Sequence, residues 1–322
     1  MPFLAIAISM GALVLALSFA CYRRCFYSAP KHHNDPYEPL RGEQFIAVGE
    51  DLFRITSIME RYSYEDLSVT APDGVPLRGR YYHFRDGAPL MILCHGYRSS
   101  ALRDCSGGHT LSRKMGFNAL VIHQRGHGDS GGKTITFGIR EREDLMAWIR
   151  LANDRFDNPP IILFGLSMGA ATVLMGNALG YPDNVTCILA DSPYSTPLDI
   201  ILKVCADLGY PPKLAEPFIR LGASLFGGFR LDACSALEAV RHAKVPILFL
   251  HGEDDRMVPC AMSETIRAAC ATPAQVCTVP DAGHCLSYMT NPLIYERNIL
   301  TFLNTIPQIR DTISQEFKNS II

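Results

Sequence analysis

A serine flanked by glycines, between an apolar run and a run of small residues, constrains this chain more than any other feature. Residues 161–164 have the character of a buried strand, and residues 170–174 that of a helix, so residues 165–169 must form a sharp turn. At such a turn Ser167 is strained, with its hydroxyl exposed, and the glycines avoid clashes with the strand and the helix. The helix start directs backbone N–H groups at the serine. The pattern predicts an activated nucleophile.

A pattern with three fixed letters also occurs in ordinary Gly–Ser turns, so its interpretation depends on partners elsewhere in the chain. A serine hydroxyl needs an imidazole to take its proton, and the imidazole needs a carboxylate to fix its tautomer. Residues 245–250 are typical of a buried strand and lead into a loop that holds Asp254 and Asp255. A further predicted strand, residues 276–279, leads into a loop that holds His284. Both candidate partners therefore follow strands.

The order Ser, Asp, His is that of the α/β-hydrolases, and the chain resembles that family over about residues 65–305. The family's acid stands in a His-Gly-x-x-Asp-x-x-Val-Pro pattern, which selects Asp255 over Asp254. The family's base closes a Gly-His pair, which selects His284. The resemblance therefore implies a catalytic triad of Ser167, Asp255 and His284. Within the family, the arrangement resembles the bacterial YqkD-like subgroup of membrane-anchored or cytosolic hydrolases.

Two upstream segments extend the resemblance. A strand-like run ends in a His-Gly pair followed by Tyr97, whose backbone N–H the resemblance assigns to an oxyanion hole together with that of Met168. Residues 123–130 resemble the family's Asp-x-Arg-Gly-His-Gly-x-Ser segment, with His123 where the family usually has Asp. That position is expected to shape the loop and not to react. His95, His127 and His251 are likewise expected to be loop-shaping partners.

The order of predicted elements indicates an α/β fold. Residues 67–70 and 77–84 alternate in polarity around a Pro-Asp-Gly turn, which predicts an antiparallel hairpin. The following strands alternate with helical patterns, which predicts a mainly parallel sheet with helices on both faces, as in the α/β-hydrolase fold. These strands are expected at about 90–94, 119–123, 161–164, 186–190, 246–250 and 275–279.

The insertion at about residues 193–243 is too long for an ordinary loop, and parts of it have helical spacing. Helices are predicted at residues 198–208, 214–226 and 234–242. Two interpretations stay open. The helices form a small cap over the nucleophile that defines an acyl pocket, or they pack on the edge of the sheet.

The amino terminus differs in kind from the rest of the chain. No charged side chain occurs between Pro2 and Ala20, and about 20 apolar residues span a bilayer as a helix. Arg23 and Arg24 follow the run and no basic side chain precedes it, so the positive-inside rule places the catalytic domain in the cytoplasm. A cleaved signal peptide and a buried core helix are the alternatives.

The predicted organisation is therefore a single-pass membrane protein with one catalytic domain. Residues 1–27 form the transmembrane anchor and residues 28–49 a linker. Residues 50–310 form the α/β-hydrolase domain, beginning with an amphipathic helix at about 50–64, and residues 311–322 form a carboxyl-terminal tail.

Composition excludes several other classes. The net charge of −2 gives no basic surface for nucleic acid. The 11 cysteines are odd in number and have no spacing typical of disulfides or zinc sites. The partners expected are a small-molecule acyl substrate and the membrane. Neither a metal nor an organic cofactor is expected, and the oligomeric state is unknown.

The sequence predicts a serine hydrolase that cleaves carboxylic esters through an acyl-enzyme intermediate. Thioester and peptide hydrolysis use the same groups, as does an acyltransferase whose acceptor is an alcohol or a thiol. A membrane-tethered binding module is the alternative without catalysis. Its usual sign is loss of a triad residue, and here all three are present.

Overall fold

The computed structural model describes residues 2–28, 35–38 and 42–321. Much of the predicted linker, residues 29–34 and 39–41, lies outside the described residues, as do residues 1 and 322. Within the described part of the linker, residues Glu43–Phe45 form a single 3-10 turn, η1.

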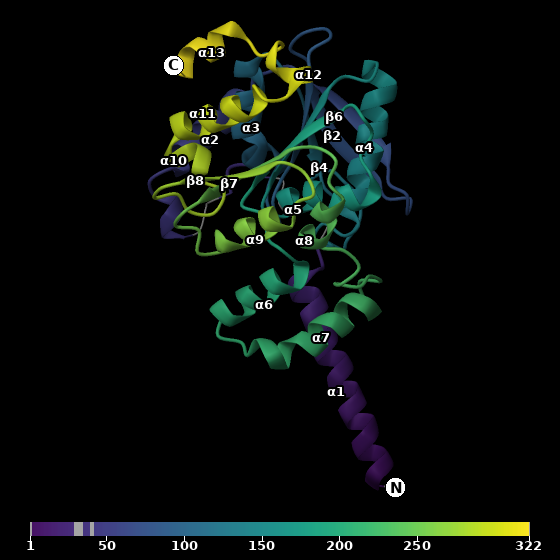
Figure 1. Cartoon of the computed structure of the whole chain (residues 1–322). Coiled ribbons are helices and arrows are strands. Elements are labelled where there is room, and N and C mark those ends of the chain that lie inside the picture. The colour runs from purple at the N-terminus through teal and green to yellow at the C-terminus, as the bar shows by residue number, and fades with distance from the viewer. Residues whose placement is uncertain (1, 29–34, 39–41, 322) are drawn as a thin grey trace.

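An eight-stranded sheet forms the centre of the molecule (Figure 1). Its order is β1-β2-β4-β3-β5-β6-β7-β8, with β2 antiparallel to both β1 and β4 and the other neighbours parallel. The predicted hairpin and the predicted mainly parallel sheet are both confirmed. The strands are β1 (Glu65–Thr70), β2 (Pro76–Tyr82), β3 (Leu90–Cys94), β4 (Asn118–His123), β5 (Ile161–Leu166), β6 (Val185–Asp191), β7 (Ile247–Gly252) and β8 (Ala274–Val279).

Side chains point alternately to the two faces of the sheet, and both faces are apolar. Helices therefore cover both faces. In β3, Ile92 packs into one hydrophobic cluster while Met91 and Leu93 pack into the other. The first cluster contains side chains of α4 (Glu141–Phe156), α5 (Met168–Met175) and α9 (Ala261–Ala269). The second contains side chains of α2 (Gly49–Glu60), α3 (Ala101–Met115), α11 (Pro292–Leu303), α12 (Pro307–Arg310) and α13 (Gln315–Ile321). Two short elements, η2 (Gly176–Leu179) and α10 (Ser287–Thr290), extend α5 and precede α11.

The insertion after β6 has two parts. The short helix α8 (Ala236–Ala239) and the turn η3 (Val240–His242) pack on the body beside α5 and α9. The longer helices α6 (Pro197–Asp207) and α7 (Pro212–Leu225) pack on each other and stand away from the body, beside α1 (Pro2–Cys25) (Figure 1). The helices lie close to their predicted positions, and the cap over the nucleophile and the packing on the sheet edge both stay predictions.

The first helix joins an exposed segment to a buried one. Residues 3–17 of α1 are exposed, and by length and composition the helix is able to cross a membrane. Beyond that segment, Tyr22 and Phe26 belong to the first hydrophobic cluster, and Phe26 is fully buried. The chain then pairs with the loop before α4, since Ile135 N–H donates to Phe26 O at 2.8 Å. The predicted anchor thus ends in residues that form part of the domain core.

The carboxyl-terminal residues also pack on the domain. Phe317 and Ile321 of α13 are buried in the second cluster. Ser314 N–H donates to Met115 O at the end of α3, at 2.9 Å. The segment predicted as a tail therefore contributes apolar side chains to the core.

Candidate active site

Ser167 occupies the sharp turn between β5 and α5. Its backbone has φ 52° and ψ −112°, a strained conformation for a residue with a side chain. A Cβ added at Gly165 would lie 2.3 Å from the carbonyl carbon of Gly169, and one added at Gly169 would lie 2.0 Å from Cys94 O at the end of β3. Neither contact is sterically tolerable, so the helix and the neighbouring strand approach Ser167 this closely only with glycine at both positions.

A chain of hydrogen bonds joins the three residues of the predicted triad. Ser167 Oγ lies 2.9 Å from His284 Nε2, and His284 Nδ1 lies 2.7 Å from Asp255 Oδ2. Because the carboxylate only accepts, Nδ1 carries the proton, and Nε2 is left to accept from the serine hydroxyl. The three side chains come from loops after β5, β7 and β8, at the carboxyl ends of parallel strands.

The loop after β7, here called the acid loop, holds Asp255 in a fixed orientation. Its Oδ1 accepts from the backbone N–H of Met257 at 3.0 Å and of Val258 at 2.8 Å. Its Oδ2 faces His251 Nε2 at 3.2 Å as well as His284. Burial by itself would raise the pKa of the Asp255 carboxyl, but hydrogen bonds from the two histidines hold that pKa well below its usual range. Asp254, in contrast, is exposed.

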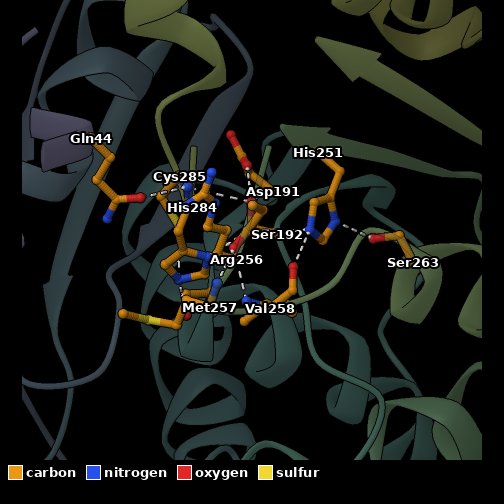
Figure 2. Close-up of polar contacts among 12 residues, drawn as sticks. Gln44, Asp191, Ser192, His251, Arg256, Met257, Val258, Ser263, His284 and Cys285 are labelled. Carbon is orange, nitrogen blue, oxygen red and sulfur yellow. Dashed lines mark hydrogen bonds and ion pairs between the residues drawn. The ribbon is translucent and has the colours of Figure 1, made fainter. Parts of the chain in front are cut away.

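His251 contacts the Asp255 carboxylate in addition to His284. Its Nε2–H donates to Val258 O at 2.8 Å, so its Nδ1 accepts from Ser263 Oγ at 2.8 Å. Figure 2 shows the loop that holds Met257 and Val258, with His251 and Ser263 on one side of it and His284 on the other. Burial lowers the pKa of His251, but its hydrogen bond to Asp255 outweighs this, so the net shift of the pKa is upward. The residue orients Asp255 and is not placed to touch Ser167.

The loop after β3 lies over the turn that carries Ser167. A Cβ added at Gly96 would lie 3.7 Å from Ser167 Cβ, so the backbone next to Tyr97 lies close to the serine. Asp104 of α3 fixes this loop, because its Oδ2 accepts from Gly96 N–H at 2.9 Å. Met168 is the first residue of α5, where backbone N–H groups have no partner within the helix. The two predicted oxyanion donors thus belong to segments on either side of the serine.

The end of α1 contacts the same loop. Tyr97 Oη donates to Cys25 O at 2.7 Å, and Arg98 Nη2 donates to Tyr27 O at 2.8 Å. The loop after β3 is therefore held on one side by α3 and on the other by the residues that follow the apolar segment.

The remaining histidines near the site hold backbone segments. His95 Nε2 accepts from Gln124 N–H at 3.0 Å, and His127 Nε2 accepts from Arg98 N–H at 2.9 Å. His123, which replaces the family's usual Asp, accepts from Asp129 N–H through Nδ1 at 3.1 Å. Burial lowers the pKa of His123 to about 4, so the neutral ring acts as the acceptor that a carboxylate would otherwise be. These contacts match the loop-shaping roles expected from the sequence.

Several residues around the triad were not singled out by sequence reasoning. Asp191 at the end of β6 is buried, and its Oδ2 accepts from Tyr295 Oη at 2.9 Å. Burial raises the pKa of this carboxyl. Gln44, within the predicted linker, accepts from His284 N–H through Oε1 at 3.4 Å (Figure 2). A strand-end Asp was a usable signal for the first, whereas no local pattern indicates the second.

Cys285 is a second side chain beside His284 that could be mistaken for the nucleophile in place of Ser167. Its Sγ lies 3.6 Å from His284 Nε2, farther than Ser167 Oγ. Burial raises the pKa of its thiol well above the usual range, so the reactive thiolate is not favoured. Packing is the role that this geometry supports.

No group of three or more histidine, cysteine or acidic side chains able to hold a metal ion occurs among residues 2–28, 35–38 and 42–321. Two surface cavities, of about 270 and 520 Å³, include none of the triad residues in their linings. Tyr82 and His109 line the smaller one, and Arg155 and Asp157 the larger. Both are separate from the chemistry of Ser167.

Comparisons with known proteins agree with this architecture. The chain is 26% identical to the YqkD protein of Bacillus subtilis over 260 residues, which covers 80% of this chain and 84% of that protein. It is 24% identical to the alpha/beta hydrolase domain-containing protein WAV2 of Arabidopsis thaliana over 268 residues, covering 78% and 82% of the two chains. A solved structure of the Pyrococcus furiosus esterase Pf2001 has the same fold, with a TM-score of 0.61 at 22% identity over 86% of this chain and 99% of that one. The model of the alpha/beta hydrolase family matches residues 91–294, and the chain belongs to that family.

Proposed function

We propose that this protein is a serine hydrolase that cleaves carboxylic esters through an acyl-enzyme intermediate. The observation that carries the proposal is the hydrogen-bonded chain from Ser167 Oγ to His284 Nε2 and from His284 Nδ1 to Asp255 Oδ2, at 2.9 and 2.7 Å. Membership of the alpha/beta hydrolase family supports a hydrolase. The narrower assignment to esters is supported by the fold that the chain shares with the Pyrococcus furiosus esterase Pf2001.

In the first half-reaction His284 Nε2 takes the Ser167 proton as Oγ attacks the ester carbonyl carbon. The N–H groups of Tyr97 and Met168 donate to the oxyanion of the tetrahedral intermediate, where each such donor contributes about 3 kcal/mol. His284 then gives its proton to the leaving alcohol as the carbonyl re-forms. Asp255 stays ionised, since its hydrogen bonds keep its pKa low, and it stabilises the imidazolium.

In the second half-reaction water replaces the alcohol. His284 takes a proton from the water, which attacks the acyl-enzyme carbonyl, and the collapse of the second tetrahedral intermediate returns the proton to Ser167 Oγ. No step of this sequence requires a group beyond the side chains and backbone of the chain and a water molecule.

We also propose that α1 spans a membrane once, with the catalytic domain on the cytoplasmic side. The proposal is supported by the exposed apolar residues 3–17 and by Arg23 and Arg24 at the end of the helix. A protease-sensitive tag at the carboxyl terminus tests it. Intact cells should protect the tag and permeabilised cells should expose it, and digestion in intact cells would reverse the orientation.

The esterase proposal is tested with the full-length protein in detergent or nanodiscs, on p-nitrophenyl esters of graded chain length. Turnover should fall by several powers of ten in Ser167→Ala. Ser195 follows β6 and its Oγ donates to Asp199 Oδ2 at 3.2 Å, so Ser195→Ala is the control and should retain turnover. Loss of turnover in Ser195→Ala alone would contradict the assignment.

Two other functions use the same site. A thioesterase or peptidase would prefer thioesters or aminoacyl arylamides in the same screen, and an acyltransferase would form more transfer product than acid as alcohol or thiol acceptor is added. A folded protein without turnover in every class would favour a membrane-tethered binding module.

A further inference from the structure

The α6–α7 hairpin carries a patch of exposed apolar side chains, here called the cap tip. These side chains are Val204, Leu208, Tyr210, Leu214, Leu225 and Phe226. Single exposed apolar residues are common on soluble domains, but several on one hairpin favour an interaction surface. Leu214 is 69% exposed and Tyr210 62%, so the body of the protein does not cover them.

One end of the cap tip lies beside the apolar helix. Helix α7 crosses α1 at backbone contact, since a Cβ added at Gly222 would lie 2.4 Å from Ser18 O. The Phe226 ring stacks edge-on against Phe19, with centroids 5.1 Å apart, and Ser18 is fully buried at the crossing. Figure 1 shows α6 and α7 between the body and the free end of α1. Helix α7, on which α6 packs, is therefore held against the last turns of the apolar segment.

The depth of this crossing follows from helix geometry. A hydrocarbon core of about 30 Å takes about 20 helical residues, so an α1 that spans it from Phe3 places Arg23 and Arg24 at the headgroups. Ser18 then lies about 8 Å below Arg23, at 1.5 Å per residue. Helix α7 contacts α1 at that level, which is the depth at which interfacial helices lie.

The composition of the hairpin turn suits a membrane surface. Residues 208–214 read Leu-Gly-Tyr-Pro-Pro-Lys-Leu, with an aromatic, a basic and several apolar side chains and no acidic one. Tyrosine and lysine place an apolar body in the membrane and a polar end at its surface. A lysine also interacts favourably with anionic lipids of a cytoplasmic leaflet.

We infer that the cap tip is a membrane-docking surface that inserts into the same leaflet from which α1 emerges. The inference rests on the proposed membrane anchoring of α1. It goes further, because it makes the cap a second point of attachment to the bilayer. Lys203 of α6 donates through Nζ to Arg256 O, next to Asp255, so the docked hairpin contacts the acid loop and the bilayer at once.

Quenching of tryptophan emission by brominated lipid tests the inference on the full chain. The protein is reconstituted in vesicles of phosphatidylcholine and phosphatidylglycerol, with and without bromine on the acyl chains. The single native tryptophan, Trp148, is fully buried in the domain and gives a constant background. Leu214→Trp and Tyr210→Trp report on the cap tip. Leu293→Trp, on α11 and 50% exposed, is the matched control away from α1, and Phe3→Trp reports on α1 itself.

Insertion to the depth of an interfacial helix predicts that bromine removes at least about half of the emission added by Leu214→Trp and Tyr210→Trp. Leu293→Trp should lose none. Quenching of Phe3→Trp without quenching at the cap tip would overturn the inference and leave the anchor in place. Absence of quenching at Phe3→Trp would instead overturn the anchor. An unquenched cap tip in a dimeric particle would assign the surface to a second copy.

Discussion

The catalytic edge of the sheet and the region of α1, α6 and α7 differ in which kinds of side chain are buried and which are exposed. At the catalytic edge, polar groups are buried and hydrogen-bonded, as Asp255 is to two histidines and two backbone N–H groups. Around α1 and the cap tip, apolar side chains are exposed. The first arrangement fixes the orientation of polar groups, and the second leaves apolar surface that a partner would remove from water.

The residues that follow the exposed part of α1 join the two regions. Phe26 packs edge-on against Phe137 and Phe229, with ring centroids 5.9 and 5.3 Å apart. The carbonyls of Cys25 and Tyr27 hold the loop of Tyr97 and Arg98. The amino-terminal helix is therefore apolar and exposed at one end, and at the other end it supports the loop beside Ser167.

Two truncations give the largest expected effect. Deletion of residues 2–27 removes Tyr22 and Phe26, and loss of one buried large aromatic costs about 3–5 kcal/mol against a total stability of about 5–15 kcal/mol. That protein should not fold, whereas deletion of residues 2–17 should leave a folded, active domain. Circular dichroism and thermal unfolding check both. A cooperative transition in the longer deletion would show that α1 is dispensable for the core.

Replacement of the acid tests the polar region. Asp255→Asn should lower kcat/KM by about 10⁴-fold, because the amide cannot hold the His284 tautomer or stabilise its cation. Asp254→Asn, at the exposed neighbour, should change kcat/KM by less than about threefold. Ester turnover measured on both proteins decides between the two carboxylates, and the reverse ranking would place the acid at Asp254.

Acid should weaken the body through its buried histidines. Burial lowers the pKa of His109 to about 4, below an unfolded value of about 6.5. Between these two pH values the unfolded chain binds a proton at His109 that the folded chain does not. Stability is full above pH ~6.5 and falls as the pH drops toward 4, by about 3 kcal/mol for this group. Urea unfolding across this range should show a shallower loss for His109→Phe. Parallel curves would mean that His109 does not carry the effect.

The smallest expected effect concerns the apolar region. Gly222→Ala places a methyl group against Ser18 O and should destabilise the contact of α7 with α1 by about 1–3 kcal/mol. Gly11→Ala is the matched control, since nothing lies within 4 Å of its added Cβ. Thermal unfolding in nanodiscs compares the two. Equal midpoints would show that α7 moves away from α1 without cost.

Local patterns were enough for the strands, the hairpin and the turn at Ser167, because each depends on period, turn residues and steric limits within a few positions. Asp255 and His284, the hydrogen-bonded partners of the site, were predicted from motifs of the α/β-hydrolase family. The contacts of Gln44 with His284, of Cys25 with Tyr97 and of Gly222 with Ser18 could not be predicted. Each joins residues far apart in sequence, and no periodicity within either segment encodes the pairing.

The proposed function depends most on Ser167 as the nucleophile, activated by His284. A fluorophosphonate probe followed by peptide mass spectrometry tests it most directly, because the probe bonds to the oxygen that attacks a carbonyl. We expect modification of Ser167 alone in the native protein, no modification of Ser167→Ala, and undiminished labelling of the control Ser195→Ala. Labelling of Cys285 or another residue, or persistent labelling and turnover in Ser167→Ala, would contradict it.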